Sequence, residues 1–384
     1  MHLCLITHEY PKTGFAHGGI GSFLKTFAPK LVAQGIKVTV VGLSYDYCED
    51  YEEDQGVQIF RLGSKNVKGL SWYYGMQVMN KKIAQIHKNN PIDVIESAEL
   101  ELAFLNKLPG IKYVIRLHGG HHFFAEAEKR KINFWKGYQE RLSFKKADAF
   151  VSISEYVKFQ TNNVLGFFNK SITLINSPID IDFFSSKNSE IKKQSIVFVG
   201  TVCEKKGIRQ LIQSFPFVKE KYPQATLEIY GRDWNYPNGK SYIEMLQETE
   251  IPQLGEASQD VYFHGPVKYE NIPEVYAQAQ LCVFPSHMET QGLVAPEAMA
   301  MEKLVIFTNQ GPGPETITNF ENGLLCNPFD PKDIAEQIIW VFSNEEKVAV
   351  ICKNARQSVI QKYASNKIIQ ENIDFYKKLI SKLK

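Results

Sequence analysis

Short apolar runs rich in β-branched residues alternate with longer stretches of helical periodicity along the chain. That alternation is typical of doubly wound parallel α/β sheets. In the first half it predicts strands at Leu3–Thr7, Val38–Gly42, Val57–Leu62, Asp93–Glu96, Tyr113–His118, Ala149–Ile153 and Ile172–Ile175. Helices are predicted near 19–34, 71–88 and 134–146, and Pro29 is expected to kink or shorten the first of them.

A polar stretch at 185–194 interrupts this pattern, and we interpret it as an interdomain linker. Strands are predicted again at Ser195–Gly200, Leu227–Gly231, Val261–Gly265, Leu281–Pro285, Leu304–Thr308 and Leu324–Asn327. The predicted helices are 208–221, 271–279, 293–301 and 331–342, and 345–384 is helical and amphipathic. We therefore expect two α/β domains, 1–187 and 188–363, with ligands bound in a cleft at the carboxyl ends of their strands.

Composition narrows the class of protein. The chain has 384 residues, 44% hydrophobic and 22% charged, which is typical of a globular protein of two ordinary domains. Its net charge of only +2 gives no global field that would favour nucleic acid as a partner. The amino terminus lacks a basic lead-in, and no run of about 18 apolar residues occurs, so neither a signal peptide nor a spanning helix is predicted. Six scattered cysteines without a CxxC pair suggest reduced thiols in a cytoplasmic protein.

The stretch 284–303, FPSHMETQGLVAPEAMAMEK, combines a strand end, a polar turn and a helix start. Its two glutamates, Glu289 and Glu297, stand on either side of Gly292. Such a junction offers free backbone N–H groups to a phosphate, and carboxylates beside it suit sugar hydroxyls. We interpret it as a site for a sugar joined to phosphate. A glycosidase acid and nucleophile is the alternative, which would need carboxyl groups about 5 to 10 Å apart.

Three further patterns have competing interpretations. His118, His121 and His122 lie on one turn and could ligate zinc, but no supporting Asp, Glu or Cys has a suitable spacing, and no metal is predicted. The glycines of 18–21 suggest a dinucleotide fingerprint, although they do not form G-x-G-x-x-G. The Asp-Ile-Asp of 180–182 is like a metal-binding DxD, but its place near the linker favours a structural role.

Taken in order, the motifs resemble those of the retaining GT-B glycosyltransferases of family 4. The family signature PS-x-x-E-(G/S)-F-G-x-x-x-x-E-A-M-A is matched by Pro285, Ser286, Glu289, Gly292 and the Glu297–Ala300 segment. Upstream, IVFVGTVCEKKGIRQLIQSF and VYFHGPV resemble further family segments, and so do Gly18-Gly19 and His118 in the first half.

The resemblance implies a metal-independent hexosyltransferase that needs no cofactor beyond its donor. The donor would be a nucleoside diphosphate sugar, with a UDP-sugar favoured, and the acceptor a sugar or lipid-linked hydroxyl in polysaccharide or glycolipid synthesis. It further implies that 1–187 binds the acceptor, 188–363 binds the donor, and the helix at 364–384 packs back on the first domain.

The same resemblance assigns roles to single residues. Glu289 and His118 would contact the transferred sugar, Lys206 the diphosphate and Glu297 the ribose. The other implied donor contacts are Gly19, Gly200, Thr201, Val267, Gly292, Leu293 and Val294.

Two departures from the family pattern bear on the donor. Thr201 stands where the family usually has Arg, so Lys206 would neutralise the diphosphate alone or with help from Arg209 or Arg232. The Thr290-Gln291 pair replaces a small residue and an aromatic one, which leaves donor choice open. A sugar-nucleotide epimerase of the same shape and a silent nucleotide-sugar-binding protein are the alternative functions.

The stretch 129–146 mixes basic residues with aromatics. It would suit contact with anionic lipid at the inner face of a membrane, which fits a lipid-linked acceptor. The alternative is a solvated helix face with Phe134 and Trp135 packed inward.

Overall fold

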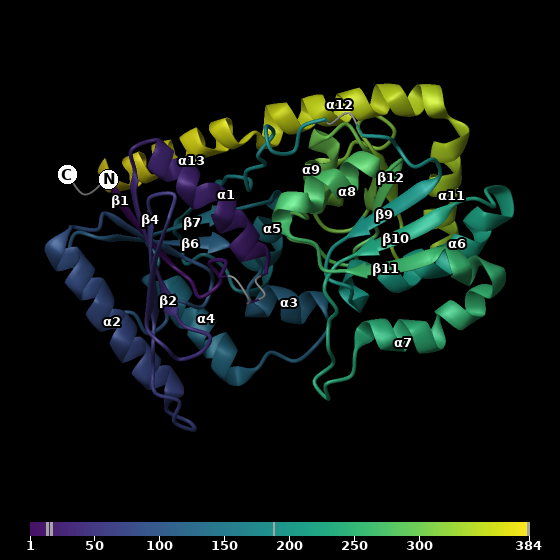
Figure 1. Ribbon diagram of the computed structural model, residues 1–384. Helices are drawn as coiled ribbons and strands as arrows, with labels where there is room; N and C mark the ends of the chain where they lie inside the picture. Colours follow the sequence, from purple (N-terminus) through teal and green to yellow (C-terminus); the bar gives the residue numbers. More distant parts are fainter. Residues whose placement is uncertain (13–14, 16–17, 187–188, 382–384) are drawn as a thin grey trace. The chain divides into compact units, whose positions relative to one another are not determined.

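The computed structural model describes residues 1–12, 15, 18–186 and 189–381 (Figure 1). The chain divides into two compact units, Met1–Pro178 with Ser365–Lys384, and Ile179–Ala364. Hereafter these are the first and the second unit. The predicted boundary between 187 and 188 lies outside the described residues.

The first unit contains an eight-stranded sheet in the order β3-β4-β2-β1-β5-β6-β7-β8. All neighbours are parallel except β3 and β4. Its strands are β1 His2–Ile6, β2 Lys37–Leu43, β3 Asp50–Asp54, β4 Val57–Leu62, β5 Val94–Ser97, β6 Lys112–Leu117, β7 Ala149–Ser152 and β8 Ser171–Leu174. The uniformly apolar runs form strands because both faces of a parallel sheet are covered.

Helices cover this sheet. They are α1 Gly19–Ala33, α2 Ser71–Asn89, α3 His121–Ala127, α4 Phe134–Lys146, α5 Glu155–Val164 and, from the end of the chain, α13 Ser365–Ser381. Pro29 does not shorten the first helix as expected, since α1 continues to Ala33. Pro29 is buried on the packed face of α1, and we attribute the helix's tolerance of the missing N–H to that burial.

Helix α13 is part of the core of the first unit. Its buried residues Ile369, Ile373 and Tyr376 join a cluster that contains Phe27 and Leu31 of α1. Figure 1 shows α13 running beside α1, the two helices coming from opposite ends of the sequence. The first unit therefore needs the last helix of the chain to complete its core.

In the first unit the sequence pattern missed β3, α3 and α5. Strand β3, with the sequence DYEED, is too acidic to be recognised as a strand, but it pairs antiparallel with β4 across a turn of Gln55 and Gly56, both with positive φ. Arg61 holds it in place through Asp50 at 3.2 Å and Glu52 at 2.7 Å. The signal that could have revealed it is this two-residue hairpin turn.

The second unit contains a six-stranded parallel sheet in the order β11-β10-β9-β12-β13-β14. Its strands are β9 Ser195–Val199, β10 Thr226–Tyr230, β11 Val261–Gly265, β12 Leu281–Phe284, β13 Leu304–Thr308 and β14 Leu324–Cys326. Its α-helices are α6 Ile208–Lys221, α7 Tyr242–Thr249, α8 Ile272–Gln278, α9 Val294–Ala300, α10 Gly313–Thr316, α11 Pro331–Ser343 and α12 Glu345–Tyr363. Two doubly wound α/β units are thus confirmed.

Strand order fixes where each unit can bind a ligand. In the first unit the strand order reverses between β1 and β5: the strands that follow β1 are added on one side of it, and those that follow β5 are added on the other side. In the second unit the order reverses in the same way between β9 and β12. Between such strands the loops at the carboxyl ends diverge and leave a crevice, which is the usual ligand site of open α/β sheets.

None of the helices within the described residues combines the length and the apolar character that crossing a bilayer requires.

Candidate functional site

The loops that follow β9 and β12 meet at the crevice of the second unit. Lys206 Nζ, from the first loop, lies 2.5 Å from Glu289 Oε1, from the second. Ser286 Oγ donates a hydrogen bond to the same oxygen at 2.8 Å. The structure thus joins two of the predicted site residues, 83 positions apart in the sequence, at the place that strand order selects.

A glycine permits this close approach of the two loops. Gly207 has a φ of 68°, and a Cβ atom there would come within 1.8 Å of the Pro285 carbonyl oxygen. The His287 N–H also donates to the Lys205 carbonyl at 2.9 Å. Lys206 is therefore held at the end of a short 3-10 turn, Glu204–Lys206, and its side chain is about one quarter exposed.

Thr201 contacts one of the two arginines that were considered as partners for Lys206. Arg232 Nε donates to Thr201 Oγ1 at 3.4 Å, and Arg232 is otherwise exposed. Arg209 is instead paired with Glu204 at 2.9 Å and with Glu250 at 3.2 Å. Of the two arginines, Arg232 is the one placed beside the residue that departs from the family pattern.

Gly200 lies where β9 and β10 end close together, an approach that Gly231 permits. Gly200 has a φ of 154°, and a Cβ on the neighbouring Gly231 would lie 1.7 Å from the Gly200 carbonyl oxygen. The backbone of 200–201 is thus packed directly against the end of the next strand.

Glu297 lies in α9 and is buried, with 7% of its surface exposed. Burial raises the pKa of Glu297 to about 7, although a hydrogen bond from Tyr276 acts against the shift. That bond is long, with 3.5 Å from the Tyr276 hydroxyl to Oε2. A buried carboxylate with one weak donor retains capacity to accept further hydrogen bonds, for example from a diol.

The turn before α9 is also set by a glycine. Gly292 has a φ of 75°, and a Cβ there would meet the Phe307 ring at 2.6 Å. Leu293 and Val294 follow it, half-buried, at the start of α9. Because α9 has only seven residues, its dipole is small.

The two glutamates have separate partners. Glu289 contacts Lys206 and Ser286, whereas Glu297 contacts Tyr276. This division of contacts gives no support to the glycosidase alternative, in which both carboxyl groups would face one bond.

His118, at the end of β6 in the first unit, is held by its backbone. Its N–H donates to Glu99 Oε1 at 2.6 Å, and its ring lies 5.3 Å from that of Phe23. Burial and nearby Arg116 lower the pKa of His118 to about 3, so its imidazole is neutral at pH 7. A neutral ring offers one donor and one acceptor, as a sugar hydroxyl requires.

The other two histidines have structural partners. His121 Nε2 accepts the Asn133 N–H at 2.9 Å, and His122 Nδ1 contacts buried Glu140. Neither lines the pocket described next. Across the part of the chain that the structure describes, no three His, Cys, Asp or Glu side chains group as metal ligands would.

Sequence reasoning missed the buried pair Glu99 and Glu140. Burial, together with Glu140, raises the pKa of Glu99 to about 8. Gly120 lies directly against them, since a Cβ there would be 1.7 Å from Glu140 Oε1. These two carboxyl groups accept the backbone N–H groups of His118 and His122 and so fix the 118–122 turn. No local sequence motif predicts either of them.

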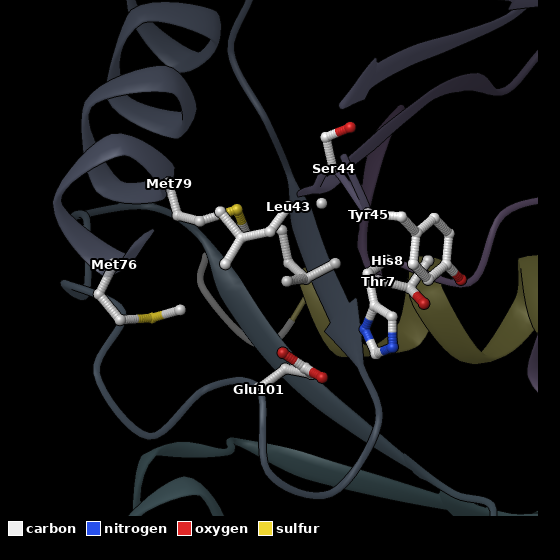
Figure 2. A pocket seen from close by; sticks show the side chains of 10 residues that line it. Thr7, His8, Leu43, Ser44, Tyr45, Met76, Met79 and Glu101 are labelled. Atoms are coloured by element: carbon white, nitrogen blue, oxygen red, sulfur yellow. The ribbon is translucent and has the colours of Figure 1, made fainter. Parts of the chain in front are cut away.

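A pocket of about 180 Å³ lies at the crevice of the first unit (Figure 2). It is formed by the ends of β1 and β2, by the loop after β5 and by one face of α2. Figure 2 shows Glu101 and the His8 ring on one side, with Met76, Met79 and Leu43 on the other. Burial raises the pKa of Glu101, while His8 acts to lower it. The sequence did not point to this pocket, because its polar residues belong to no motif.

The remaining predicted residues are placed as follows. Gly19 is exposed at the start of α1, and a Cβ there would meet open space. Val267 is half-buried and follows β11, the edge strand. Asp180 Oδ1 accepts the backbone N–H groups of Asp182 and Phe183 at 3.3 Å, which agrees with a structural role.

Two α/β units with polar side chains at their crevices are typical of nucleotide-binding enzymes. Family models agree with this class. Residues 17–183 match Glycosyltransferase Family 4, and residues 180–358 match Glycosyl transferases group 1. The chain therefore belongs to the group 1 glycosyltransferases, which confirms the family that its motifs resemble.

Relatives of similar length support the assignment. An uncharacterised glycosyltransferase of Methanocaldococcus jannaschii is 27% identical, over 98% of each chain. The capsular polysaccharide biosynthesis glycosyltransferase CapM of Staphylococcus aureus is 25% identical, over 80% of this chain and 82% of its own.

Solved structures confirm the GT-B fold. Sucrose-phosphate synthase from Thermosynechococcus elongatus has a TM-score of 0.85 at 19% identity, over 99% of both chains. HepE of Anabaena, solved with UDP and glucose, has a TM-score of 0.76 at 18% identity, over 97% of this chain and 98% of its own.

Proposed function

We propose that this protein is a retaining glycosyltransferase that moves a hexosyl unit from a nucleoside diphosphate sugar to an acceptor hydroxyl. The observation that carries the proposal is the Lys206–Glu289 pair at the crevice of the second unit. Polysaccharide or glycolipid synthesis is the proposed setting, in keeping with the capsular role of CapM. A UDP-sugar is the proposed donor, supported by the UDP and glucose in HepE.

The donor's diphosphate would replace Glu289 as the partner of Lys206. The ammonium group then neutralises the charge that develops on the diphosphate as the bond to the sugar breaks. Glu289 is released to accept hydrogen bonds from the sugar, and Glu297 accepts those of the ribose hydroxyls. Gly19, Gly200, Thr201, Val267, Gly292, Leu293 and Val294 complete the proposed donor contacts.

Arg232 would supply the second positive charge. Its contact with Thr201 places it at the carboxyl end of β9, next to the proposed diphosphate position. In this proposal Thr201 and Arg232 together replace the arginine that the family usually has at position 201.

Retention follows if the acceptor attacks on the face that the diphosphate leaves. The bond from the anomeric carbon to the phosphate oxygen breaks, and a bond to the acceptor oxygen forms on that same face. The departing phosphate accepts the acceptor's proton. This route needs neither a side-chain base nor a metal ion, and the protein contributes position and charge.

The acceptor would bind to the first unit. The pocket beside Glu101 and His8 offers polar groups to hydroxyls and an apolar wall to a ring face. Neutral His118 would hydrogen-bond the transferred sugar. We accordingly propose 1–187, with the final helix 364–384, as the acceptor domain, and 188–363 as the donor domain. A cytoplasmic location, with residues 129–146 in contact with the inner face of a membrane, completes the proposal.

Donor binding and turnover test this function directly. A thermal-shift panel of UDP-, GDP- and ADP-sugars would identify the donor, and mass spectrometry would identify the products. Lys206→Ala is expected to lower kcat/KM by about 100- to 1,000-fold. Lys205→Ala, which removes the adjacent lysine, is the matched control and should have little effect.

Other outcomes would contradict the proposal or favour one of the alternative functions. Unchanged transfer by Lys206→Ala would show that the site is wrongly placed. An epimerised donor formed without acceptor would identify an epimerase, and donor binding without turnover over a broad acceptor panel would identify a silent binding protein. Activity abolished by EDTA and restored only by manganese would contradict metal independence.

A further inference from the structure

Two exposed aromatic segments of the first unit lie side by side. The first contains the start of α2, and the second contains the start of α4. The Trp72 ring, from α2, lies 5.4 Å from that of Trp135, from α4, and Phe104 stacks on Trp135 at 5.6 Å. We call their exposed apolar residues the aromatic surface: Val67, Leu70, Trp72, Tyr73, Ile132, Phe134, Trp135 and Tyr138.

These side chains are not packed inward. Phe134 is 85% exposed, which contradicts the alternative that it and Trp135 pack into the protein. Trp135 is still 40% exposed even though it contacts two other rings. Contiguous exposed apolar side chains of this size mark interaction sites in soluble proteins.

The aromatic surface is bordered by positive charge. Exposed lysines accompany both segments, at Lys65, Lys68, Lys129, Lys131 and Lys136. Between 65 and 74 there is no acidic residue. Of the three near the second segment, Glu128 pairs with Arg130, Glu140 is buried and Glu126 is exposed. In a chain whose net charge is only +2, this is a local excess.

We propose that the aromatic surface binds the face of an anionic lipid bilayer through both segments. Trp and Tyr favour the boundary between headgroups and acyl chains, and Lys favours anionic headgroups. A second copy of this chain would fit less well, since it would bring like charges together. The proposal extends the contact expected at 129–146 to α2, and it does not depend on the catalytic assignment.

Helix α2 links this surface to the pocket of the first unit. Tyr73 lies on the surface and Met79 lines the pocket, and six helical residues rise by only about 9 Å. An acceptor carried on a lipid could therefore reach the pocket from the bilayer. This consequence, unlike the binding itself, rests on the proposed function.

Vesicle co-sedimentation of the full chain tests the binding. The wild type should bind vesicles of phosphatidylglycerol and phosphatidylcholine, and bind pure phosphatidylcholine at least tenfold more weakly. Tyr73→Ser with Phe134→Ser should weaken binding to the anionic vesicles by at least tenfold. Lys131→Ala with Lys136→Ala should weaken it by about 30-fold and reduce its salt dependence.

Matched controls keep the test specific. Phe159→Ser removes an aromatic ring of α5 that is 64% exposed, and Lys377→Ala with Lys378→Ala removes two exposed lysines of α13. Both should bind the anionic vesicles as the wild type does. Circular dichroism checks that every variant is folded.

Three results would overturn the proposal. They are no binding by the wild type, equal binding by test and control variants, and a dimer in light scattering that Tyr73→Ser with Phe134→Ser abolishes. The last would assign the surface to self-association. Transfer to a soluble acceptor, measured without vesicles, is a separate readout, so failure of lipid binding with transfer intact would contradict only the lipid proposal.

Discussion

Two buried glutamates, one in each unit, differ in how completely they are partnered. Glu96 of the first unit accepts hydrogen bonds from Arg116 Nε at 2.7 Å, Arg116 Nη2 at 3.2 Å and the Tyr376 hydroxyl at 2.7 Å. Among the described contacts of Glu297 in the second unit, the one hydrogen-bond donor is Tyr276, at 3.5 Å. A fully partnered buried carboxylate stabilises the fold, whereas an incompletely partnered one is available to a ligand.

The network around Glu96 connects the sheet to the last helix. Arg116 Nη2 also donates to Asn372 Oδ1 at 2.5 Å, and the guanidinium lies about 5 Å from the rings of Phe23 and Phe27. Asn372 and Tyr376 both belong to α13. The network therefore fixes which way α13 packs, a structural task that leaves Glu96 little capacity for a ligand.

The largest effect on the free energy of unfolding should come from removing the donors of Glu96. Arg116→Ala leaves Glu96 buried without its counter-ion, and we expect a loss of about 3 to 5 kcal/mol in the free energy of unfolding of the first unit. Urea denaturation measures it. Replacing both members, Arg116→Met with Glu96→Met, should recover much of the loss. A loss below 1 kcal/mol for Arg116→Ala would mean that water already reaches Glu96.

Neutralising Glu297 is expected to have a smaller effect on the free energy of unfolding. Its folded-state pKa of about 7 exceeds its unfolded value near 4.5, so the folded protein binds more protons in that interval. The stabilisation from this group is complete below pH 4.5 and is lost as pH rises through 7. Glu297→Gln should remove that loss, and at pH 8 it should be more stable than the wild type by up to about 3 kcal/mol.

Donor binding should show the opposite pH dependence. If the ribose needs the ionised carboxylate, the wild type should bind donor more weakly as pH falls through 7, whereas Glu297→Gln should bind weakly at every pH. Denaturation and donor titrations of both proteins from pH 5 to 8.5 measure the two effects. Parallel pH profiles for wild type and variant would show that Glu297 does not titrate in this range.

The smallest expected effect is on the donor KM, and it distinguishes Arg232 from Arg209. Arg232→Ala should raise the donor KM by about fivefold, because an exposed charge beside a diphosphate contributes about 1 kcal/mol. Arg209→Ala should leave KM nearly unchanged, because Arg209 is engaged by Glu204 and Glu250. Steady-state kinetics with a fixed acceptor provides the measurement, and the reverse ranking would move the second charge to Arg209.

Much of the fold was predictable because parallel strands are buried on both faces. Apolar runs such as that of β1 can therefore be recognised as strands from the sequence alone. Strand β3 was missed because its stability comes from pairing with β4 and from Arg61, and neither is local. Helix α5 was missed even though Ser154 caps it, with Oγ accepting the Val157 N–H at 3.1 Å.

For the proposed donor site, the sequence supplied candidate residues but not their contacts. The family resemblance proposed Lys206, Glu289 and Glu297, because their motifs match the family's segments in order. That Lys206 pairs with Glu289, and that Arg232 rather than Arg209 lies beside Thr201, depends on how two loops meet.

The sequence by itself therefore determined two α/β units, most of their strands and the charged groups at one crevice, because periodicity and turn chemistry are local. Only the tertiary structure decided that Glu96 has several close hydrogen-bond donors and Glu297 has not, and that Trp72 lies against Trp135. These are contacts between residues distant in sequence, and their energies depend on burial and on neighbours that no local pattern encodes.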